Sequence, residues 1–268
     1  MHSYVGNDSF FRKEKELLVS RSYKVFVSEG QEWLGENKCE VGTIYVSLAN
    51  PYFYGDKFAA VVRHTQQYYK KIDIVLGGIL YHNAYFSTSV LQESIRRGLA
   101  KRFESRYKDE QLSRYEAMFL SGELSLKYAE VYLEHAKNTA IHEEVHHFFN
   151  ESKAVKEALE KAARNFVNKH DSEDLPDDVK QHHVDMFKAF IVEELVMFAA
   201  AADKNRATYI YPGRRIDFLE DISSGFFPNT PECLLKIQSV LLMVKPMKTG
   251  SGKSKKRRMR LAQKIQTE

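Results

Sequence analysis

The chain has few of the features that define several protein classes. Two of its 268 residues are cysteines, Cys39 and Cys233, too few for a disulfide framework or for a metal site made of thiolates alone. No apolar run reaches the roughly 18 residues that a transmembrane helix needs, and residues 1–15 contain no apolar signal-peptide segment. We therefore expect a cytoplasmic protein with no membrane partner, and we exclude fibrous, collagen-like and disulfide-stabilised classes.

The chain also has little net charge, but this charge is unevenly distributed. Its 40 Lys and Arg residues and 36 Asp and Glu residues give a formal net charge of +4. Residues 245–268 hold nine of the basic residues and one Glu, so this segment carries +8 and residues 1–244 carry −4. We interpret residues 245–268 as a flexible basic tail that either binds nucleic acid or another anionic surface, or only keeps the protein soluble.

Short apolar runs predict the strands of a parallel sheet. Runs rich in β-branched and aromatic residues lie at 23–27, 43–48 and 208–211. The near-continuous apolar run at 72–80 is typical of a strand that is buried on both faces. Helical spacing at 58–69 separates two of these strands, so we expect a βαβ unit with a right-handed crossover.

The second half of the chain is predicted to be mostly helical. Residues 234–244 form a last strand or a helix. We predict an α/β fold, with a parallel sheet of about five strands flanked by helices. It forms one domain over residues 21–244, preceded by an N-terminal extension of residues 1–20. Apolar residues at three- to four-residue spacing predict helices at 89–107, 112–134, 139–169 and 184–202.

Ser47 follows a predicted strand at the point where the chain turns toward a helix. In open α/β sheets, ligands bind beyond the carboxyl ends of the strands, where this hydroxyl would project. The period of two places Thr43, Tyr45 and Ser47 on one face of the strand. Asn50 can hydrogen-bond the turn or a substrate carbonyl. Taken alone, however, the segment is better explained as an ordinary strand end before an Asn-Pro turn.

Glu194 lies among apolar residues on a predicted helix. Phe187, Phe190 and Leu195 surround it at helical spacing. A carboxylate on such a face is costly unless it meets a cation or hydrogen-bond donors, so Glu194 is a candidate for binding an ammonium group or transferring a proton. Glu193, one step around the helix, is expected to be the more solvated of the two. The alternative is a helix face that is partly exposed at this point.

Residues 89–108 carry a dense stripe of positive charge. Six basic residues stand against two acidic ones, and several of them share one broad helix face. Like charges at this density repel one another, which favours a phosphate backbone as partner over a merely solvated face. The basic residues are Arg96, Arg97, Lys101, Arg102, Arg106 and Lys108.

His142, Glu143 and His146 match the HExxH pattern of zinc hydrolases, with two His one helical turn apart and a Glu as base. The third ligand could be Glu193 or Glu194. Since the chain has ten histidines, a chance match is expected. We therefore predict no metal, and we retain a zinc hydrolase that uses the HExxH residues only as an alternative function.

Three features in order resemble the tRNA-dependent cyclodipeptide synthases. They are Ser47 after a strand, the Glu194-Leu195 pair on a downstream helix, and Tyr211-Pro212 shortly after it, accompanied by the basic helix. The resemblance covers about residues 20–245. It implies a Rossmann-like domain similar to the catalytic domains of class I tyrosyl- and tryptophanyl-tRNA synthetases. It also implies an aminoacyltransferase that converts two aminoacyl-tRNAs into a 2,5-diketopiperazine as a monomer, without a cofactor or metal.

The resemblance also implies roles for individual residues. Ser47 would be the nucleophile that carries an aminoacyl group, Glu194 would hold its α-ammonium, and Tyr211 would relay a proton. Tyr211-Pro212 resembles the Tyr-Pro branch of the family, whereas Asn50 is typical of the Tyr-His branch. Phe190 stands where the family usually has a tyrosine. Either Glu194 acts without that partner, another tyrosine such as Tyr209 or Tyr128 substitutes for it, or the match has a different register at this position.

The remaining implied site residues form two groups. The first group binds substrate, and three of its members line the pocket of the first amino acid: Thr43, Tyr45 and Val75, together with Asn50, Phe190 and Glu193. The second group would bind the acceptor stem of the tRNA through its phosphates: Arg96, Arg97, Lys101, Arg102 and Arg106. A non-catalytic tRNA- or RNA-binding module is the alternative to the enzyme.

Overall fold

A computed structural model describes most of the chain between the predicted N-terminal extension and the basic tail. Residues 1–20, and those of the tail beyond residue 247, lie outside the described part. The first two tail residues, Lys245 and Pro246, belong to the last strand of the sheet. The structure describes residues 23–31, 34, 41–47, 50–77, 93–170, 175–205, 208–213 and 217–247.

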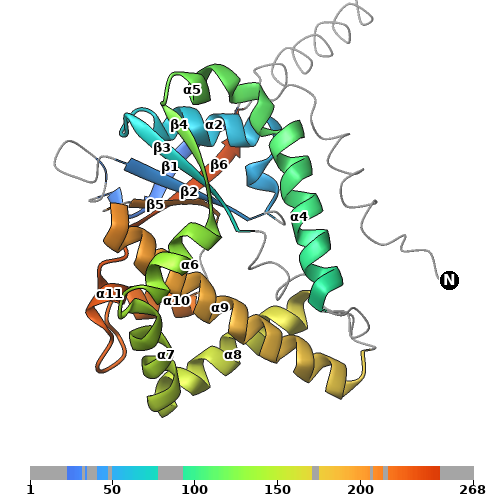
Figure 1. Cartoon of the computed structure of the whole chain (residues 1–268), viewed down its shortest axis with the longest axis vertical. Helices are drawn as coiled ribbons and strands as arrows, with labels where there is room; N and C mark the ends of the chain where they lie inside the picture. Colours follow the sequence, from blue (N-terminus) through green and yellow to red (C-terminus); the bar gives the residue numbers. More distant parts are fainter. Residues whose placement is uncertain are drawn as a thin grey trace, which may run out of the picture.

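A six-stranded sheet forms the centre of the structure (Figure 1). Its strand order is β1-β6-β5-β2-β3-β4, and all neighbouring strands are parallel except β1, which pairs antiparallel with β6. The predicted α/β class with a largely parallel sheet is therefore confirmed, with one strand more than expected. The strands are β1 (Tyr23–Glu29), β2 (Val41–Val46), β3 (Lys71–Leu76), β4 (Leu124–Tyr128), β5 (Thr208–Pro212) and β6 (Ser239–Pro246).

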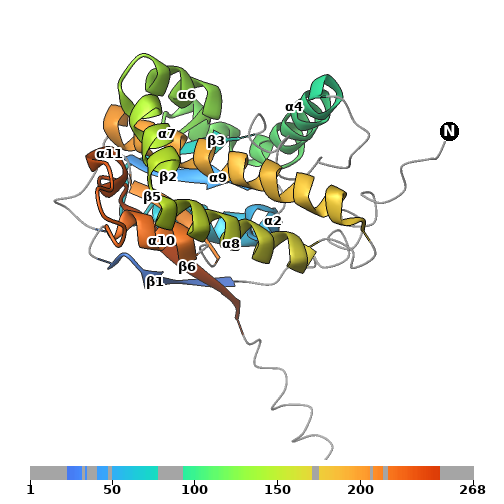
Figure 2. The ribbon, with the colours of Figure 1, turned by 90° about the horizontal axis from the view of Figure 1, so that it is seen from below.

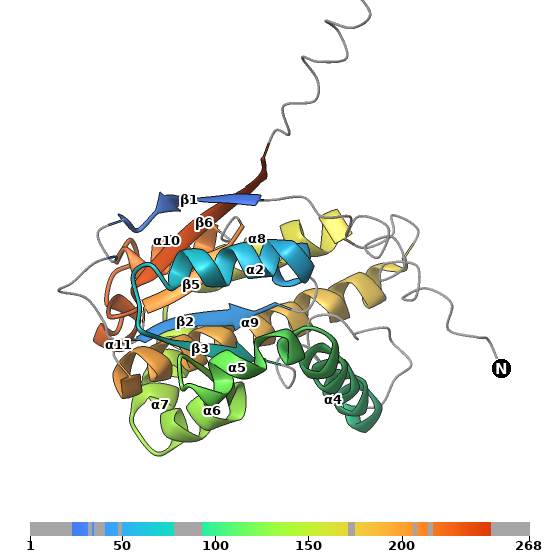
Figure 3. The same ribbon diagram turned by 90° about the horizontal axis from the view of Figure 1, so that it is seen from above.

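Helices cover both faces of the sheet, as the buried strands require. Figure 3 looks onto the face covered by α2, and Figure 2 onto the layer that contains α8 and α9. Within the described residues, no helix combines the length and the apolar composition needed to cross a bilayer. The helices are α2 (Gly55–Thr65), α4 (Glu93–Glu110), α5 (Glu116–Leu120), α6 (Ala129–Lys137), α7 (Ile141–Glu151), α8 (Lys153–His170), α9 (Asp177–Asn205), α10 (Asp217–Ser223) and α11 (Glu232–Leu235), with short 3-10 helices η2 (Pro51–Phe53) and η3 (Leu112–Tyr115).

The period-2 alternation of β2 divides the core into two clusters. Ile44 and Val46 pack with α2 on one face of the sheet, while Tyr45 packs with the helical layer on the other. The second cluster contains residues of α6, α7, α8 and α9, so the helix-rich second half of the sequence forms one continuous layer. Ser47 directly follows the last residue of β2.

Two predicted helices are wrong in their extent. Residues 112–134 do not form one helix but η3, α5, β4 and α6. Gly122 adopts a φ of 77° in the turn before β4, and β4 then pairs along β3, so pairing in the sheet overrides the helical composition of this segment. Residues 139–169 are divided into α7 and α8 at Ser152, which is extended and whose hydroxyl accepts a hydrogen bond from Val155 N.

Candidate active site

A tight turn follows β2 and positions Ser47 at the carboxyl end of the sheet. Asn50 N donates to Ser47 O over 2.9 Å. The Asn50 side chain caps η2, since its Oδ1 accepts from Tyr52 N at 2.9 Å, and Pro51 suits the first position of that helix because it has no N–H to satisfy. The Asn-Pro turn is therefore present. The strand β2 ends just before Ser47, and the turn begins at Ser47.

The same Asn50 joins this turn to the neighbouring strand β5. Its Nδ2 donates to Tyr211 Oη at 3.1 Å and to Pro212 O at 2.9 Å. With Oδ1 bound to Tyr52 N, both donor hydrogens and the acceptor of the amide are engaged by protein groups. Asn50 thus fixes the position of Tyr211 relative to Ser47, instead of presenting a free amide to a substrate.

The Tyr211 side chain lies close to the other predicted catalytic residues. Its hydroxyl contacts both Asn50 and Ser47, and the Glu194 carboxylate is close enough to influence it. Burial raises the pKa of Tyr211, and the Glu194 charge adds to this, while the hydrogen bonds to Asn50 and Ser47 act in the opposite direction. The structure therefore brings Ser47, Glu194 and Tyr211 together from positions far apart in the sequence, with a protonated tyrosine at neutral pH.

The two adjacent glutamates of α9 face different neighbours. Glu194 is half-buried on the side that includes buried Phe187, Phe190 and Leu195, and its charge acts on Tyr211. Phe190 is stacked on Phe187, with ring centroids 5.6 Å apart. Glu193 points toward α7 instead, where its Oε1 lies 3.4 Å from His146 Nε2. Of the two glutamates, Glu194 is therefore the one placed beside the Ser47–Tyr211 pair.

The three residues predicted to line a pocket do lie together. Thr43, Tyr45 and Val75 border a cavity of about 10 Å³, roughly the space of one water molecule. The Tyr45 ring is buried beside this cavity: it is 1% exposed and packs edge-on against Phe198, with centroids 5.3 Å apart. A Cβ atom at Gly77 would lie 1.8 Å from Tyr45 Oη, so the glycine leaves room for the tyrosine hydroxyl.

The structure also contains a buried polar group that the sequence analysis missed. The Asp73 carboxylate is 8% exposed on β3, where it accepts hydrogen bonds from Ser125 on β4 and, over 3.4 Å, from Tyr132 Oη on α6. Tyr132 also borders the cavity beside Tyr45. A single Asp in the otherwise apolar strand of residues 72–76 was the available signal, because an unpaired carboxylate would not be stable there.

The basic helix α4 stands on the side of the molecule toward which β2 points (Figures 1 and 3). Lys101, Arg102 and Arg106 are exposed, and Arg106 Nε forms an ion pair with Glu110 Oε1 at 2.8 Å. The predicted residues Arg96 and Arg97 belong to α4, but their side chains lie outside the described part of the structure. Lys101 and Arg102 are therefore the clearest described cations for a polyanionic partner.

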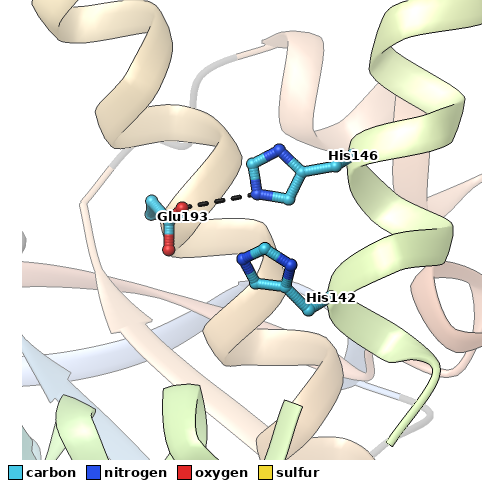
Figure 4. Close-up of side chains that lie close together, drawn as sticks. All are labelled: His142, His146 and Glu193. Atoms are coloured by element: carbon cyan, nitrogen blue, oxygen red, sulfur yellow. Dashed lines mark ion pairs between the residues drawn. The ribbon is translucent and has the colours of Figure 1, made fainter. Parts of the chain in front are cut away.

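The HExxH segment gains a third potential ligand in the folded chain. His142 and His146 lie one turn apart on α7, with ring centroids 4.3 Å apart, and Glu193 approaches from α9 (Figure 4). Potential ligand atoms of the three residues all lie within 4.8 Å of one another. The His146 imidazole lowers the pKa of Glu193, against the opposing effect of burial. Glu143 is exposed.

Comparisons with known proteins point to one family. The family model described as cyclodipeptide synthase matches residues 37–224. A cyclodipeptide synthase structure from Fluoribacter dumoffii is 15% identical and has a TM-score of 0.68, covering 84% of this chain and 100% of that one. Another from Bacillus thermoamylovorans is 15% identical, with a TM-score of 0.57 over 84% of this chain and 96% of that one.

A Mycobacterium tuberculosis protein, described as relating cyclodipeptide synthetases to type I tRNA synthetases, has a similar fold. It is 12% identical and has a TM-score of 0.58, covering 86% of this chain and 96% of that one. No curated protein sequence matches the chain. The chain thus shares its fold with these three structures despite low sequence identity.

Proposed function

The chain belongs to the cyclodipeptide synthase family, and from this we propose that it makes a 2,5-diketopiperazine from two aminoacyl-tRNAs through an aminoacyl-enzyme on Ser47. As a member of the family it is a peptide-bond-forming enzyme that depends on aminoacyl-tRNA. The observation that supports the covalent mechanism is the meeting of Ser47, Glu194 and Tyr211 at the carboxyl end of the sheet.

In the first step, Ser47 Oγ attacks the ester carbonyl of the first aminoacyl-tRNA. The Oγ–C bond forms, the bond between that carbon and the ribose oxygen breaks, and the serine proton passes to the departing ribose oxygen. Glu194 holds the α-ammonium of the bound aminoacyl group, since a half-buried carboxylate gains most from a cationic partner. An ester is already activated, so neither ATP nor a metal is required by this step.

In the second step, the amine of the second aminoacyl-tRNA attacks the Ser47 ester and gives a dipeptidyl-tRNA, while Ser47 regains its proton. The free amine of the dipeptide then attacks the remaining ester, which closes the ring and releases the tRNA. Tyr211 relays the proton between this amine and the departing oxygen. Its raised pKa suits a donor that stays protonated at neutral pH, and Asn50 holds the hydroxyl in position.

The first amino acid that this site accepts is proposed to have a small side chain. Tyr45 lies two residues before Ser47 on the same strand face, and its ring leaves a cavity of only about 10 Å³. A bulky side chain would require Tyr45 to move out of its contacts with Phe198 and Tyr209. Thr43 Oγ1, which is buried and has no hydrogen-bond partner among the described residues, offers a polar contact deeper in this region.

The tRNA is proposed to lie along α4. Lys101 and Arg102 are exposed cations that can contact phosphates of the acceptor stem, which positions the substrate without reading its sequence. Arg96, Arg97 and Arg106 would extend this contact. We also propose that the protein belongs to the Tyr-Pro branch of the family, because Tyr211 is followed by Pro212.

Mass spectrometry of the medium of cells that express the protein tests this function. We expect a cyclodipeptide whose two residues identify the substrates, and its loss in Ser47→Ala. Incubation with labelled aminoacyl-tRNA should leave the label on the wild-type protein and none on Ser47→Ala. Normal product from Ser47→Ala would overturn the covalent mechanism, and salt-dependent RNA binding without any product would favour the non-catalytic RNA-binding module.

A further inference from the structure

We propose that His142, His146 and Glu193 form a binding site for one divalent transition-metal ion of the zinc class, which links α7 to α9 outside the proposed catalytic centre. The residues come from two helices of the layer that covers one face of the sheet (Figures 1 and 4). Neither Ser47 nor Tyr211 takes part, so the proposed metal ligands are separate from the residues of the proposed acyl transfer.

The spacing of the ligand atoms is close to that of a tetrahedral site. Bonds of about 2.0–2.1 Å at tetrahedral angles place neighbouring ligand atoms about 3.3–3.4 Å apart. His146 Nε2 and Glu193 Oε1 are already 3.4 Å apart, and all three potential ligand atoms lie within 4.8 Å. Small side-chain rotations, with shifts of at most about 1.4 Å, would therefore bring His142 to the same ion.

An unsatisfied atom at this position also favours a ligand. His146 Nε2 is buried, and it makes no hydrogen bond to any residue in the described part of the chain, although it faces the Glu193 carboxylate. A buried ring nitrogen without a hydrogen bond is costly. A cation between the nitrogen and the carboxylate would satisfy both groups.

The donor set selects the class of metal. Two imidazoles and one carboxylate suit zinc and its neighbours in the first transition series, whereas magnesium and calcium prefer oxygen donors. Three protein ligands leave a fourth position for water. His146 and Glu193 also border an open groove of about 960 Å³ along α7, α8 and α9, which provides an entry path and room for that water.

The site accounts for the HExxH spacing without a hydrolase. Two histidines one turn apart share a helix face, and the third ligand, which the sequence left open between two glutamates, is Glu193. Glu144 acts elsewhere: together with burial, its carboxylate raises the pKa of the Cys233 thiol on α11 to about 12. The ion would hold the turn of α9 that also carries Glu194, so metal binding would fix the helix turn next to the proposed ammonium site.

Metal binding by the full-length, untagged protein tests the proposal. After removal of metals by a chelator, titration with Zn²⁺ followed by elemental analysis should give one ion per chain, and Co²⁺ should give the visible absorption of a four-coordinate site. His146→Ala and Glu193→Gln should weaken metal binding by more than about 100-fold. Mutating residues that only hydrogen-bond to metal ligands already lowers metal affinity about 10- to 100-fold, and loss of a ligand should cost more. His147→Ala, which changes an exposed histidine on the same helix, is the matched control.

Thermal unfolding distinguishes this site from binding by unfolded chains. Zn²⁺ should raise the melting temperature of the wild type and of His147→Ala, and leave that of the nearly isosteric Glu193→Gln unchanged. No stoichiometric ion in the wild type, or equal losses in His146→Ala and His147→Ala, would overturn the proposal. Either result leaves the Ser47 labelling experiment unaffected, so the two proposals fail separately.

Discussion

At the scale of single residues, one amide organises the proposed catalytic centre. Asn50 uses both amide hydrogens and its oxygen to connect the turn after β2 with β5. Glu194 could be predicted from its own segment, whereas Ser47 and Tyr211 could be predicted only with the family resemblance, since the Ser47 segment alone is better explained as an ordinary strand end. The position of Asn50 between them could not, since hydrogen bonds between residues 161 and 162 positions apart leave no local pattern.

Tyr211→Phe removes the proposed proton relay and keeps the ring in place. The ring packs against Phe53 and Tyr209, so the fold should be retained. We expect labelling of Ser47 by the first aminoacyl group to persist while cyclodipeptide release falls by about 10²-fold or more. Single-turnover labelling and product mass spectrometry measure the two steps. Unchanged product release would remove Tyr211 from the relay.

Tyr45 sets the size of the proposed pocket, and this can be changed without touching Ser47. Tyr45→Leu should admit bulkier first amino acids, seen as new cyclodipeptides in the mass spectrum. Loss of the buried ring should also destabilise the fold by about 1–3 kcal/mol, measured by urea unfolding. Tyr45→Phe, which keeps the ring and its volume, is the control and should retain the wild-type products. An unchanged product spectrum in Tyr45→Leu would show that the pocket lies elsewhere.

At the scale of secondary-structure elements, contacts with neighbouring strands determine whether a segment becomes a strand or a helix where its local sequence is compatible with both. The strands β2 and β3 were predictable because Val, Ile, Leu or Tyr side chains make up four of the six residues in each, as expected of strands that are buried on both faces. The strand β4 was not, since Leu124–Tyr128 is composed of residues that also suit a helix and becomes a strand only by pairing with β3. The hydrogen bond from Ser125 of β4 to the buried Asp73 of β3 was equally unpredictable from local sequence, because it depends on the same pairing of β4 with β3.

The helix α4 gives a prediction at this scale. Lys101→Ala combined with Arg102→Ala should weaken tRNA binding, and each lost phosphate contact should reduce the slope of log affinity against log salt by about 0.7–0.9. Binding measured over a range of salt concentrations checks both effects. Lys153→Ala on α8, also an exposed cation, is the matched control. Equal behaviour of the double variant and the control would contradict a tRNA site on α4.

At the scale of the whole molecule, a small net charge conceals two basic regions on an acidic body. The formal charge of +4 combines a segment of +8, residues 245–268, with a remainder of −4 that itself includes the basic helix α4. The two regions are attached differently, since α4 belongs to the folded domain and nearly all of the tail follows its last strand.

Deleting residues 248–268 separates the contributions of the two regions. The truncated chain keeps all of β6 and loses eight basic residues. We expect weaker tRNA binding with a smaller salt dependence, while labelling of Ser47 at saturating aminoacyl-tRNA is retained. Salt titrations of tRNA binding, with the full-length chain as reference, measure the change. If neither affinity nor salt dependence changes, the tail serves solubility alone.

The pairing of β1 with β6 has a consequence for how the protein is made. Tyr23 lies opposite Pro246, and β6 fills the position between β1 and β5, so the described strand that is synthesised last occupies an interior place in the sheet. Until β6 is synthesised, β1 and β5 therefore have exposed edges, which can pair with the wrong strand. A chain truncated before residue 239 would contain both Ser47 and Tyr211 but would lack β6, so β1 and β5 would have no strand between them. We therefore expect a message truncated there to yield aggregates instead of a partly active enzyme.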